Sequence, residues 1–236
     1  MPRIKRTAAE EGNGNEELSL SRLKARSKKQ DEKEKSKERI LESATKLFAL
    51  KGFDGVGVRE ICKEANANIC MISYFWGGKK ELYDGIIENL IEKQIDYAKS
   101  YLNLEIEPSK LSKQEQINLL YTIFDKAIDF LYGDFISDDL FRFILQEQQK
   151  RSIALNSPVF VYVRKLVAAI FNKDVNDKDI IFKTVFIMSQ MNSPKVLPAF
   201  SLDLLKQDNF TKEDIEIIKN NLKIYLNALI KEAEIV

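Results

Sequence analysis

The sequence predicts an all-α protein, and two observations support this fold class. Only 9 of the 236 residues are glycine and 5 are proline, whereas a β-sandwich or barrel needs many turns rich in these residues. Apolar residues also recur at the three- and four-residue spacing of a helix along most of the chain. We therefore expect a small N-terminal unit of three helices and a larger helical unit after it.

Residues 1–35 are polar and highly charged, with almost no aromatic content. Such a segment buries too little apolar surface to offset the entropy lost on ordering, so we expect it to be disordered. Two interpretations stay open at this point, a solvated tail or a basic arm that contacts nucleic acid. The basic residues of such an arm are Arg22, Lys24, Arg26, Lys28 and Lys29.

The first helix is expected at residues 36–51, with Ser36 as its N-cap. Its apolar stripe consists of Ile40, Ala44, Leu47 and Phe48. Gly52 is expected to end the helix, because glycine adopts the left-handed conformation that a helix C-terminus requires. Phe53 can then pack back against the last turn.

Two short helices follow, at residues 58–65 and 69–75, and a turn at residues 66–68 separates them. Asn68 is the expected N-cap of the second one. Two short helices joined by a tight turn after an amphipathic helix form a helix-turn-helix module, whose second helix can enter a DNA major groove. The charge distribution agrees, since residues 1–103 hold 20 basic and 17 acidic residues.

Gly77 and Gly78 break the chain before a long fourth helix, expected at residues 79–102. The remaining sequence predicts further helices from their apolar spacing and their capping residues. These helices are expected at residues 113–131, 137–150, 158–171, 177–190, 199–207 and 211–233. Thr211 and Asp214 give the last of them a cap and an acidic first turn.

Several function classes are excluded by composition. The chain has no histidine, which removes histidine-based catalysis, Ser-His-Asp triads and the common zinc sites. Cys62 and Cys70 form no C-x-x-C pair, so we expect neither a metal site nor a disulfide. The sequence also has no P-loop, no apolar run of membrane-spanning length and no secretory signal. We therefore expect no catalytic residue, metal, cofactor or membrane partner, and a cytoplasmic protein.

The first ninety residues carry a family resemblance. Residues 36–90 resemble the DNA-binding domain of the TetR family along their whole length. The resemblance rests on Arg39-Ile40-Leu41, Ala44, Leu47-Phe48, Lys51-Gly52-Phe53, Val58-Arg59-Glu60-Ile61, Ala65, Ile72, Tyr74, Trp76, Lys79 and Glu81-Leu82-Tyr83. It implies a disordered extension (1–35), a helix-turn-helix domain (36–83) and a C-terminal ligand-binding and dimerisation domain (84–236).

The resemblance also implies which residues contact DNA. Tyr74 and Lys79 match the family's phosphate-binding tyrosine and lysine, and Arg59 lies where a base or phosphate contact is common. The full set of expected DNA-binding residues is Arg59, Asn68, Ile69, Cys70, Met71, Ser73, Tyr74, Phe75 and Lys79. The apolar members suit thymine methyl groups.

Three positions depart from the family pattern. Gly57 replaces the usual threonine cap of the second helix, which removes a hydroxyl that contacts phosphate. Asn66 replaces the usual glycine of the turn, and asparagine tolerates a left-handed conformation. Phe75-Trp76 replaces a polar-aromatic pair, which leaves the phosphate contacts near residue 75 open.

Some of these residues have a structural interpretation instead. We expect Ile72 and Trp76 to lie in the core, and Cys62 to be a buried small apolar residue. Cys70 is interpreted as a contact residue, with a redox switch as the alternative.

The C-terminal domain is expected to provide a ligand pocket and a dimer interface, although each apolar residue there can equally be ordinary core. The expected pocket residues are Ile91, Ile95, Phe124, Ile128, Phe141, Leu145, Phe171 and Phe186, with Arg142, Gln146 and Gln148 as polar groups. The expected dimer interface is a four-helix bundle built on Ile180, Val185, Met188, Ile215, Ile218, Leu222, Tyr225 and Leu229.

The resemblance thus implies a homodimeric transcriptional regulator that binds double-stranded operator DNA. We expect a repressor that a small, largely apolar molecule releases from a palindromic operator. The effector, the operator sequence and the regulated genes are not encoded in any recognisable pattern. Two alternatives stay open, a small-molecule-binding helical protein with a vestigial helix-turn-helix and an enzyme.

Overall fold

A computed structural model describes residues 8–150 and 157–235 of the chain. All regular elements in this described part are helices, so the predicted all-α class is confirmed. The chain divides between Asp84 and Gly85 into two compact units, which are described separately below. None of the described helices combines the length and the apolar character needed to cross a membrane.

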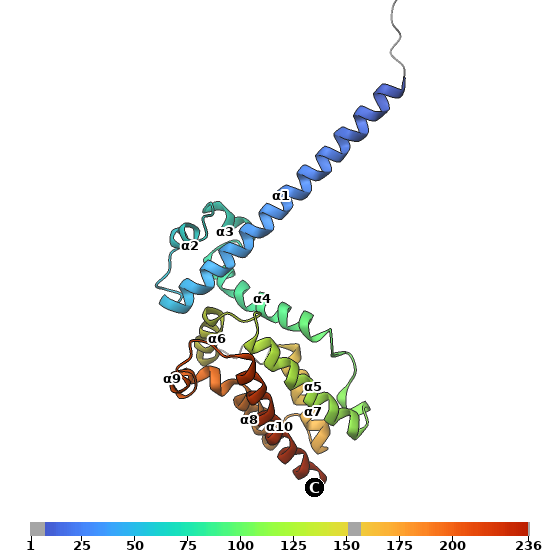
Figure 1. The fold of residues 1–236 in the computed structure, drawn as a ribbon, viewed down its shortest axis with the longest axis vertical. Coiled ribbons are helices and arrows are strands. Elements are labelled where there is room, and N and C mark those ends of the chain that lie inside the picture. The colour runs from blue at the N-terminus through green and yellow to red at the C-terminus, as the bar shows by residue number, and fades with distance from the viewer. Residues whose placement is uncertain (1–7, 151–156, 236) are drawn as a thin grey trace, which may run out of the picture. The chain divides into compact units, whose positions relative to one another are not determined.

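The first unit is a three-helix arrangement completed by the start of a fourth helix. It holds α1 (Ala8–Lys51), α2 (Val58–Glu64), α3 (Cys70–Phe75) and the first residues of α4 (Lys79–Ala98). Both α2 and α3 pack against the C-terminal half of α1 (Figure 1).

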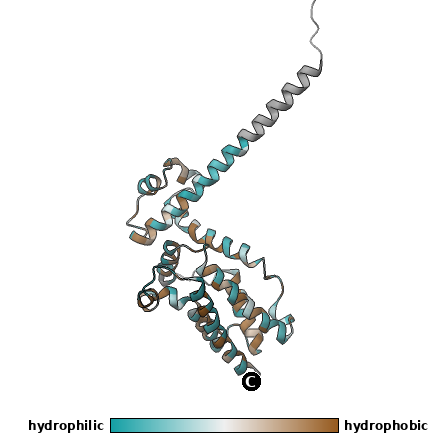
Figure 2. Cartoon of the chain, viewed as in Figure 1, coloured by the Kyte–Doolittle hydropathy of each residue, from teal (hydrophilic) through white to brown (hydrophobic). Residues whose placement is uncertain are grey.

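The helix α1 begins far earlier than the sequence predicts. Residues 8–35 continue the helix expected at residues 36–51, so the prediction of disorder is wrong for them, and Ser36 is not an N-cap. The prediction rested on the lack of apolar residues, but a polar segment can remain helical when a packed helix propagates into it, because nucleation occurs only once. Helix formers and opposite charges support the extension, as in the exposed Glu34–Lys37 pair at 3.6 Å. Figure 2 shows the hydrophilic character of α1 from Arg26 onward.

A small apolar core holds the first unit together. The predicted stripe of α1 forms one side of it, and α2, α3 and α4 each contribute buried residues. Those with at most 1% exposure are Ile40, Ala44, Phe48, Ile61, Ile72 and Leu82. Phe48, Phe53 and Tyr83 form an aromatic cluster, with ring centroids 4.9 Å apart for Phe48–Tyr83 and 5.0 Å apart for Phe53–Tyr83. This cluster fixes the start of α4 against the end of α1.

Left-handed residues end the helices of this unit. Gly52 has a φ of 71° and its N–H bonds the Phe48 carbonyl at 2.9 Å, so the predicted end of α1 is confirmed. Gly77 has a φ of 92° in the break before α4. Asn66, in the turn between α2 and α3, has a φ of 47°, which confirms that asparagine adopts the left-handed conformation there.

The second unit is a helical bundle. After α4 come α5 (Lys113–Tyr132), α6 (Asp138–Lys150), α7 (Pro158–Phe171), α8 (Lys178–Val196), α9 (Leu202–Leu205) and α10 (Lys212–Ile235). Short 3₁₀ turns, η1 (Pro108–Lys110) and η3 (Pro198–Phe200), precede α5 and α9. The expected pieces at residues 113–131, 137–150, 158–171 and 211–233 agree closely with α5, α6, α7 and α10.

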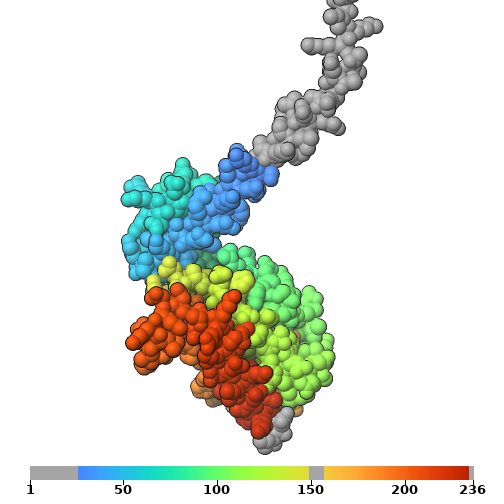
Figure 3. Space-filling view, viewed as in Figure 1, coloured from blue at the N-terminus to red at the C-terminus, as the bar shows by residue number. Residues whose placement is uncertain are grey.

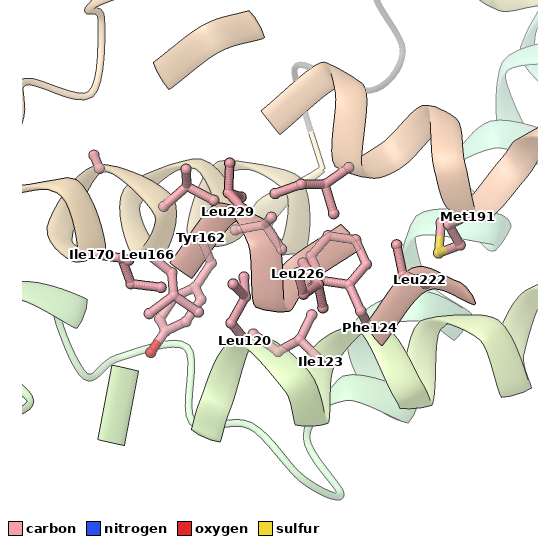
Figure 4. Packing of buried hydrophobic residues seen from close by; sticks show 14 of the residues in the cluster. Leu120, Ile123, Phe124, Tyr162, Leu166, Ile170, Met191, Leu222, Leu226 and Leu229 are labelled. Carbon is pink, nitrogen blue, oxygen red and sulfur yellow. The ribbon is translucent and has the colours of Figure 1, made fainter. Parts of the chain in front are cut away.

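The core of the second unit lies between α5, α7, α8 and α10 (Figure 4). Helix caps set the ends of these helices. Ser112 and Glu115 form a capping box at the start of α5, and the Thr211 hydroxyl accepts a bond from the Asp214 N–H at 3.2 Å, as predicted. The helix α8 is longer than expected, since it runs to Val196 and contains Pro194 in its last turn.

The left-handed turn between α2 and α3 gives a first prediction. We expect Asn66→Ala to lower the free energy of unfolding of the first unit by about 1 kcal/mol, because a Cβ without a local polar partner disfavours this conformation. Asn66→Gly is the matched control and should cost less than the alanine variant. Trp76, the single tryptophan, lies in this unit, so its fluorescence during urea denaturation measures the effect. Equal stability of the alanine and wild-type proteins would contradict the argument.

Candidate nucleic-acid interface and ligand cavity

The turn between α2 and α3 positions the surface that was expected to contact DNA. The Asn68 side-chain oxygen accepts a bond from the Cys70 N–H at 2.9 Å, which satisfies a free donor at the start of α3. At the end of α2, the Arg39 Nε donates to the Ala65 carbonyl at 3.3 Å. These two contacts fix the turn from both sides.

The helix α3 turns one side to the core and the other to solvent. Ile72 is 1% exposed, whereas Tyr74 is 63% exposed. The other exposed residues of the expected set are Arg59, Asn68, Ile69, Cys70 and Ser73. Met71, Phe75 and Lys79 are half-buried, so they flank this face. The structure thus brings the expected residues of α3 together on one exposed surface.

Two aromatic contacts support this surface. Tyr74 packs edge-on against Phe75 with ring centroids 5.2 Å apart, and Phe75 packs similarly against Trp76 at 5.4 Å. Trp76 is half-buried rather than fully in the core. Phe75 therefore packs between Tyr74 and Trp76 and supports the position of the Tyr74 ring.

Basic groups lie beside the exposed face of α3. The Lys79 ammonium lies 4.2 Å from the centroid of the Phe53 ring, a cation–π contact that holds the charge at the start of α4. The Lys33 ammonium lies 4.4 Å from the centroid of the Tyr74 ring and donates a hydrogen bond to its hydroxyl. Lys33 was not among the expected residues, because the sequence placed the start of the helix after it. The sequence feature that could have identified Lys33 is its position two helical turns before Ile40, which places both residues on the same side of the helix.

The two cysteines differ in environment. Cys62 is buried, as expected, and burial raises the pKa of its thiol, which makes it less reactive. Cys70 is free and exposed on α3. The basic residues Arg22 and Lys24 lie outside the residues whose side chains the structure describes.

A cavity of about 120 Å³ lies in the second unit, bounded by α4, α5, α6, α7 and α8. Ile91, Phe124, Phe141 and Leu145 of the expected pocket line it, together with Gln148. No charged side chain is among its described lining residues. The volume is well below the roughly 300 Å³ or more typical of drug-sized sites, and is of the size that holds a single small ring.

Two of the polar groups at the cavity are paired with each other. The Ser157 hydroxyl donates to the Gln94 side-chain oxygen at 2.6 Å, which links the start of α7 to α4. Tyr101 also lines the cavity, and burial raises the pKa of its hydroxyl to about 12. The lining therefore suits a neutral and largely apolar molecule.

The other expected pocket residues lie elsewhere. Ile128 and Phe171 belong to the core between α5, α7, α8 and α10. Phe186 is 56% exposed, and Ile95 is half-buried outside the cavity lining. Arg142 forms an ion pair with Asp139 at 3.5 Å instead of facing the cavity. These assignments to the pocket are corrections, because apolar spacing alone does not distinguish core from cavity.

The expected dimer interface also needs correction. Ile180 is 0% exposed, and Leu222 and Leu229 are buried in the same core. Met188, Ile215, Ile218 and Tyr225 pack against that core. Among the described side chains, the large apolar residues that α8 and α10 expose are Ile181, Phe182, Val185, Phe186, Val196, Ile217 and Ile224. Val185 is the one member of the expected interface set among these exposed residues. The sequence did not show which side of α8 is exposed, because both sides of this helix are apolar.

Comparison with known proteins agrees with a helix-turn-helix in the first unit. Residues 40–86 match the family described as bacterial regulatory proteins, tetR family. The probable HTH-type transcriptional regulator YttP of Bacillus subtilis strain 168 is 41% identical over 92 residues, or 38% of this chain and 41% of that protein. The HTH-type transcriptional repressor NicS of Pseudomonas putida is 24% identical over 42% of this chain and 46% of its own length. The matches thus span less than half of either relative.

Solved structures support the fold of a larger part of the chain. A regulator from Clostridium perfringens aligns with a TM-score of 0.57 and 19% identity, over 78% of this chain and 96% of that one. The TetR family regulator PfmR from Thermus thermophilus aligns with a TM-score of 0.54 and 15% identity, over 80% and 94% of the two chains. Residues 40–86 therefore resemble the DNA-binding domain of tetR-family regulatory proteins, and the two alignments show that the fold of most of the chain is shared with solved regulators.

Proposed function

We propose that this protein is a transcriptional repressor that binds double-stranded operator DNA through α3 and is released by a small, largely apolar molecule. The observation that carries the proposal is the exposed face of α3, with Cys70, Ser73 and Tyr74 side by side and the ammonium groups of Lys33 and Lys79 next to them. Repression of transcription, rather than activation, is supported by the name of the relative NicS, a transcriptional repressor. Its site of action is then the cytoplasm, where operator DNA lies.

The residues of this face divide into two roles. Lys79, Tyr74 and Arg59 supply charges or a hydroxyl, which suit the phosphate backbone and fix the register of the protein on DNA. Ile69, Cys70 and Met71 offer apolar or weakly polar contacts, which suit thymine methyl groups in the major groove. Because α3 is short, we expect the residues at its N-terminal end to be the ones that reach the base edges.

A homodimer is the second part of the proposal. The exposed apolar residues of α8 and α10 form a surface of the kind that monomers rarely leave in water. Two copies can bury it as a four-helix bundle around a two-fold axis. A two-fold dimer also matches a palindromic operator, whose half-sites lie about one DNA turn apart.

Control by a ligand is the third part. The helix α4 carries Lys79 at its first residue, and Leu90, Ile91 and Gln94 of the same helix line the cavity. Its 20 residues correspond to a length of about 30 Å. A ligand that favours one position of α4 over another therefore changes the position of the phosphate contact. The competing hypothesis, a ligand-binding protein with a vestigial helix-turn-helix, is excluded if the protein selects a DNA sequence from a random pool.

Lys79→Ala should weaken binding to all DNA sequences alike. Removing one phosphate contact makes the slope of log affinity against log salt concentration less steep by about 0.9 per subunit, because fewer counterions are released. Tyr74→Phe should also weaken binding uniformly. Fluorescence anisotropy with labelled duplexes at several salt concentrations measures both effects. Lys93→Ala, an exposed lysine farther along α4, is the control, and an unchanged slope for the Lys79 variant would contradict its assignment.

Substitutions at base-reading positions should act differently. Met71→Gln and Cys70→Ser are expected to alter which bases are preferred at particular half-site positions, by about 1–3 kcal/mol per base pair. Selection of bound fragments from random DNA, with the wild type in parallel, measures this preference. A loss of affinity that is the same for every sequence would rule out base reading by these residues.

The dimer is tested by charging its exposed apolar face. Phe182→Glu with Phe186→Glu should give a monomer, because two buried carboxylates would oppose each other across the two-fold axis. Leu50→Glu is the matched control, since Leu50 of α1 is 57% exposed and Phe186 is 56% exposed. Sedimentation velocity of the three proteins gives the oligomeric state. A double variant that remains a dimer would place the interface elsewhere.

Ligand control is tested through its reciprocity. A ligand that lowers operator affinity a hundredfold must itself bind a hundredfold more weakly to the DNA complex, which corresponds to about 2.7 kcal/mol of coupling. Calorimetry of a lipophilic compound found by screening, with and without the selected duplex, measures both affinities. Equal ligand affinities in the two titrations would eliminate the mechanism for that compound.

A further inference from the structure

The described part of α1 continues beyond the helix-turn-helix, and its side chains are described from Arg26 onward (Figure 3). The helical period determines which of them share a face. Lys33 lies seven residues before Ile40, or about two turns, so both point to the same side of the helix. Ile40 is fully buried against the first unit. Lys33 therefore extends the side of α1 that carries α2 and α3.

Other basic residues follow Lys33 on this side. Lys29 lies four residues before Lys33, and Arg26 lies seven before it, so all three share one face. Lys29 and Arg26 are exposed, and Lys33 is half-buried. Asp31, Glu34 and Glu38 lie on a different face, since they are spaced three and four residues apart and are out of register with Lys33. Glu32 lies three residues after Lys29 and borders the basic face. The side of α1 that carries Arg26, Lys29 and Lys33 is therefore basic, with one acidic residue at its edge.

The contact between Lys33 and Tyr74 joins this basic face to α3. The Lys33 ammonium bonds the Tyr74 hydroxyl and lies 4.4 Å from the centroid of its ring. Tyr74 is exposed on the surface that the proposed function assigns to DNA. The positive surface thus continues from α3 along α1, and Arg26 lies about 10 Å farther along the helix axis than Lys33.

We infer that Arg26, Lys29 and Lys33 form a helical extension of the DNA-binding surface, which contacts phosphates next to the segment read by α3. The inference rests on the proposed function, since it adds to the same interface. Because α1 is already helical, the extension loses little conformational entropy on binding, unlike a flexible basic arm. Its contacts are to the backbone, so they add affinity without sequence preference.

The test compares two faces of α1 with equal loss of charge. Arg26→Gln with Lys29→Gln removes two charges of the basic face and leaves the Lys33–Tyr74 contact in place. Lys28→Gln with Lys35→Gln removes two charges from another face, because these two residues are seven apart and share it. The probe is a labelled random-sequence duplex of about 40 base pairs, roughly four helical turns. Circular dichroism checks that both variants keep their helical content.

The salt slope of binding should become less steep by up to about 2 per subunit for the first variant, and affinity in about 0.1 M salt should fall about tenfold or more. The second variant should keep the wild-type slope. Equal slopes for both variants, changed or unchanged, would overturn the inference. The proposed function is tested separately in the same series, because Lys79→Ala must still flatten the slope if α3 binds DNA. A wild-type protein without salt-dependent binding would overturn both proposals.

Discussion

The small apolar core of the first unit is the constraint on which the DNA-binding geometry depends. Helices as short as α2 and α3 are not stable alone in water, because nucleation costs more than so few residues regain. They persist because both pack against α1, and Ile61 and Ile72 are buried, as are Ile40 and Phe48 of α1. The same packing decides which residues are left outside. With Ile72 turned inward, Tyr74 must face solvent, so the burial of one residue orients the recognition surface.

Short-range signals account for the parts that the sequence predicted well. The turn residues Gly52 and Asn66 adopt left-handed conformations in the structure, and their chemistry alone indicates where α1 and α2 end. The Asn68 side chain accepts a bond from the Cys70 N–H two residues on, although the N-cap position of α3 is Ile69 and not Asn68 as predicted. Within the second unit, α7 was predicted with its observed bounds, because Pro158 begins the helix and an apolar run continues to Phe171. Such features need no knowledge of the tertiary fold.

Long-range packing accounts for the parts that the sequence did not predict. The side of α8 that faces the core depends on α5, α7 and α10, and the helix presents apolar residues on both sides. Ile180 and Phe182 lie on opposite sides of this helix and are both apolar, yet the first is 0% exposed and the second 61% exposed. The division between core and cavity has the same origin, because Phe124 belongs to the core and also lines the cavity, whereas Phe171 belongs to the core alone. The start of α1 was missed because hydrophobicity was used as the criterion for order, whereas helix propagation from a packed segment does not require it.

The size of the cavity limits how a ligand can act on α4. A hundredfold change in DNA affinity requires about 2.7 kcal/mol of differential binding. At about 25 cal/mol for each Å² of apolar surface removed from water, this corresponds to roughly 110 Å² more buried in one state than in the other. A molecule that fits entirely within 120 Å³ contacts the same walls in both states, so it gains little by moving them. Under the proposed function, we therefore expect an inducer to be larger than the present cavity and to displace Ile91 or its neighbours on α4. The contact between Ser157 and Gln94 ties α4 to α7 at the cavity, so it is a polar interaction that opposes such a displacement.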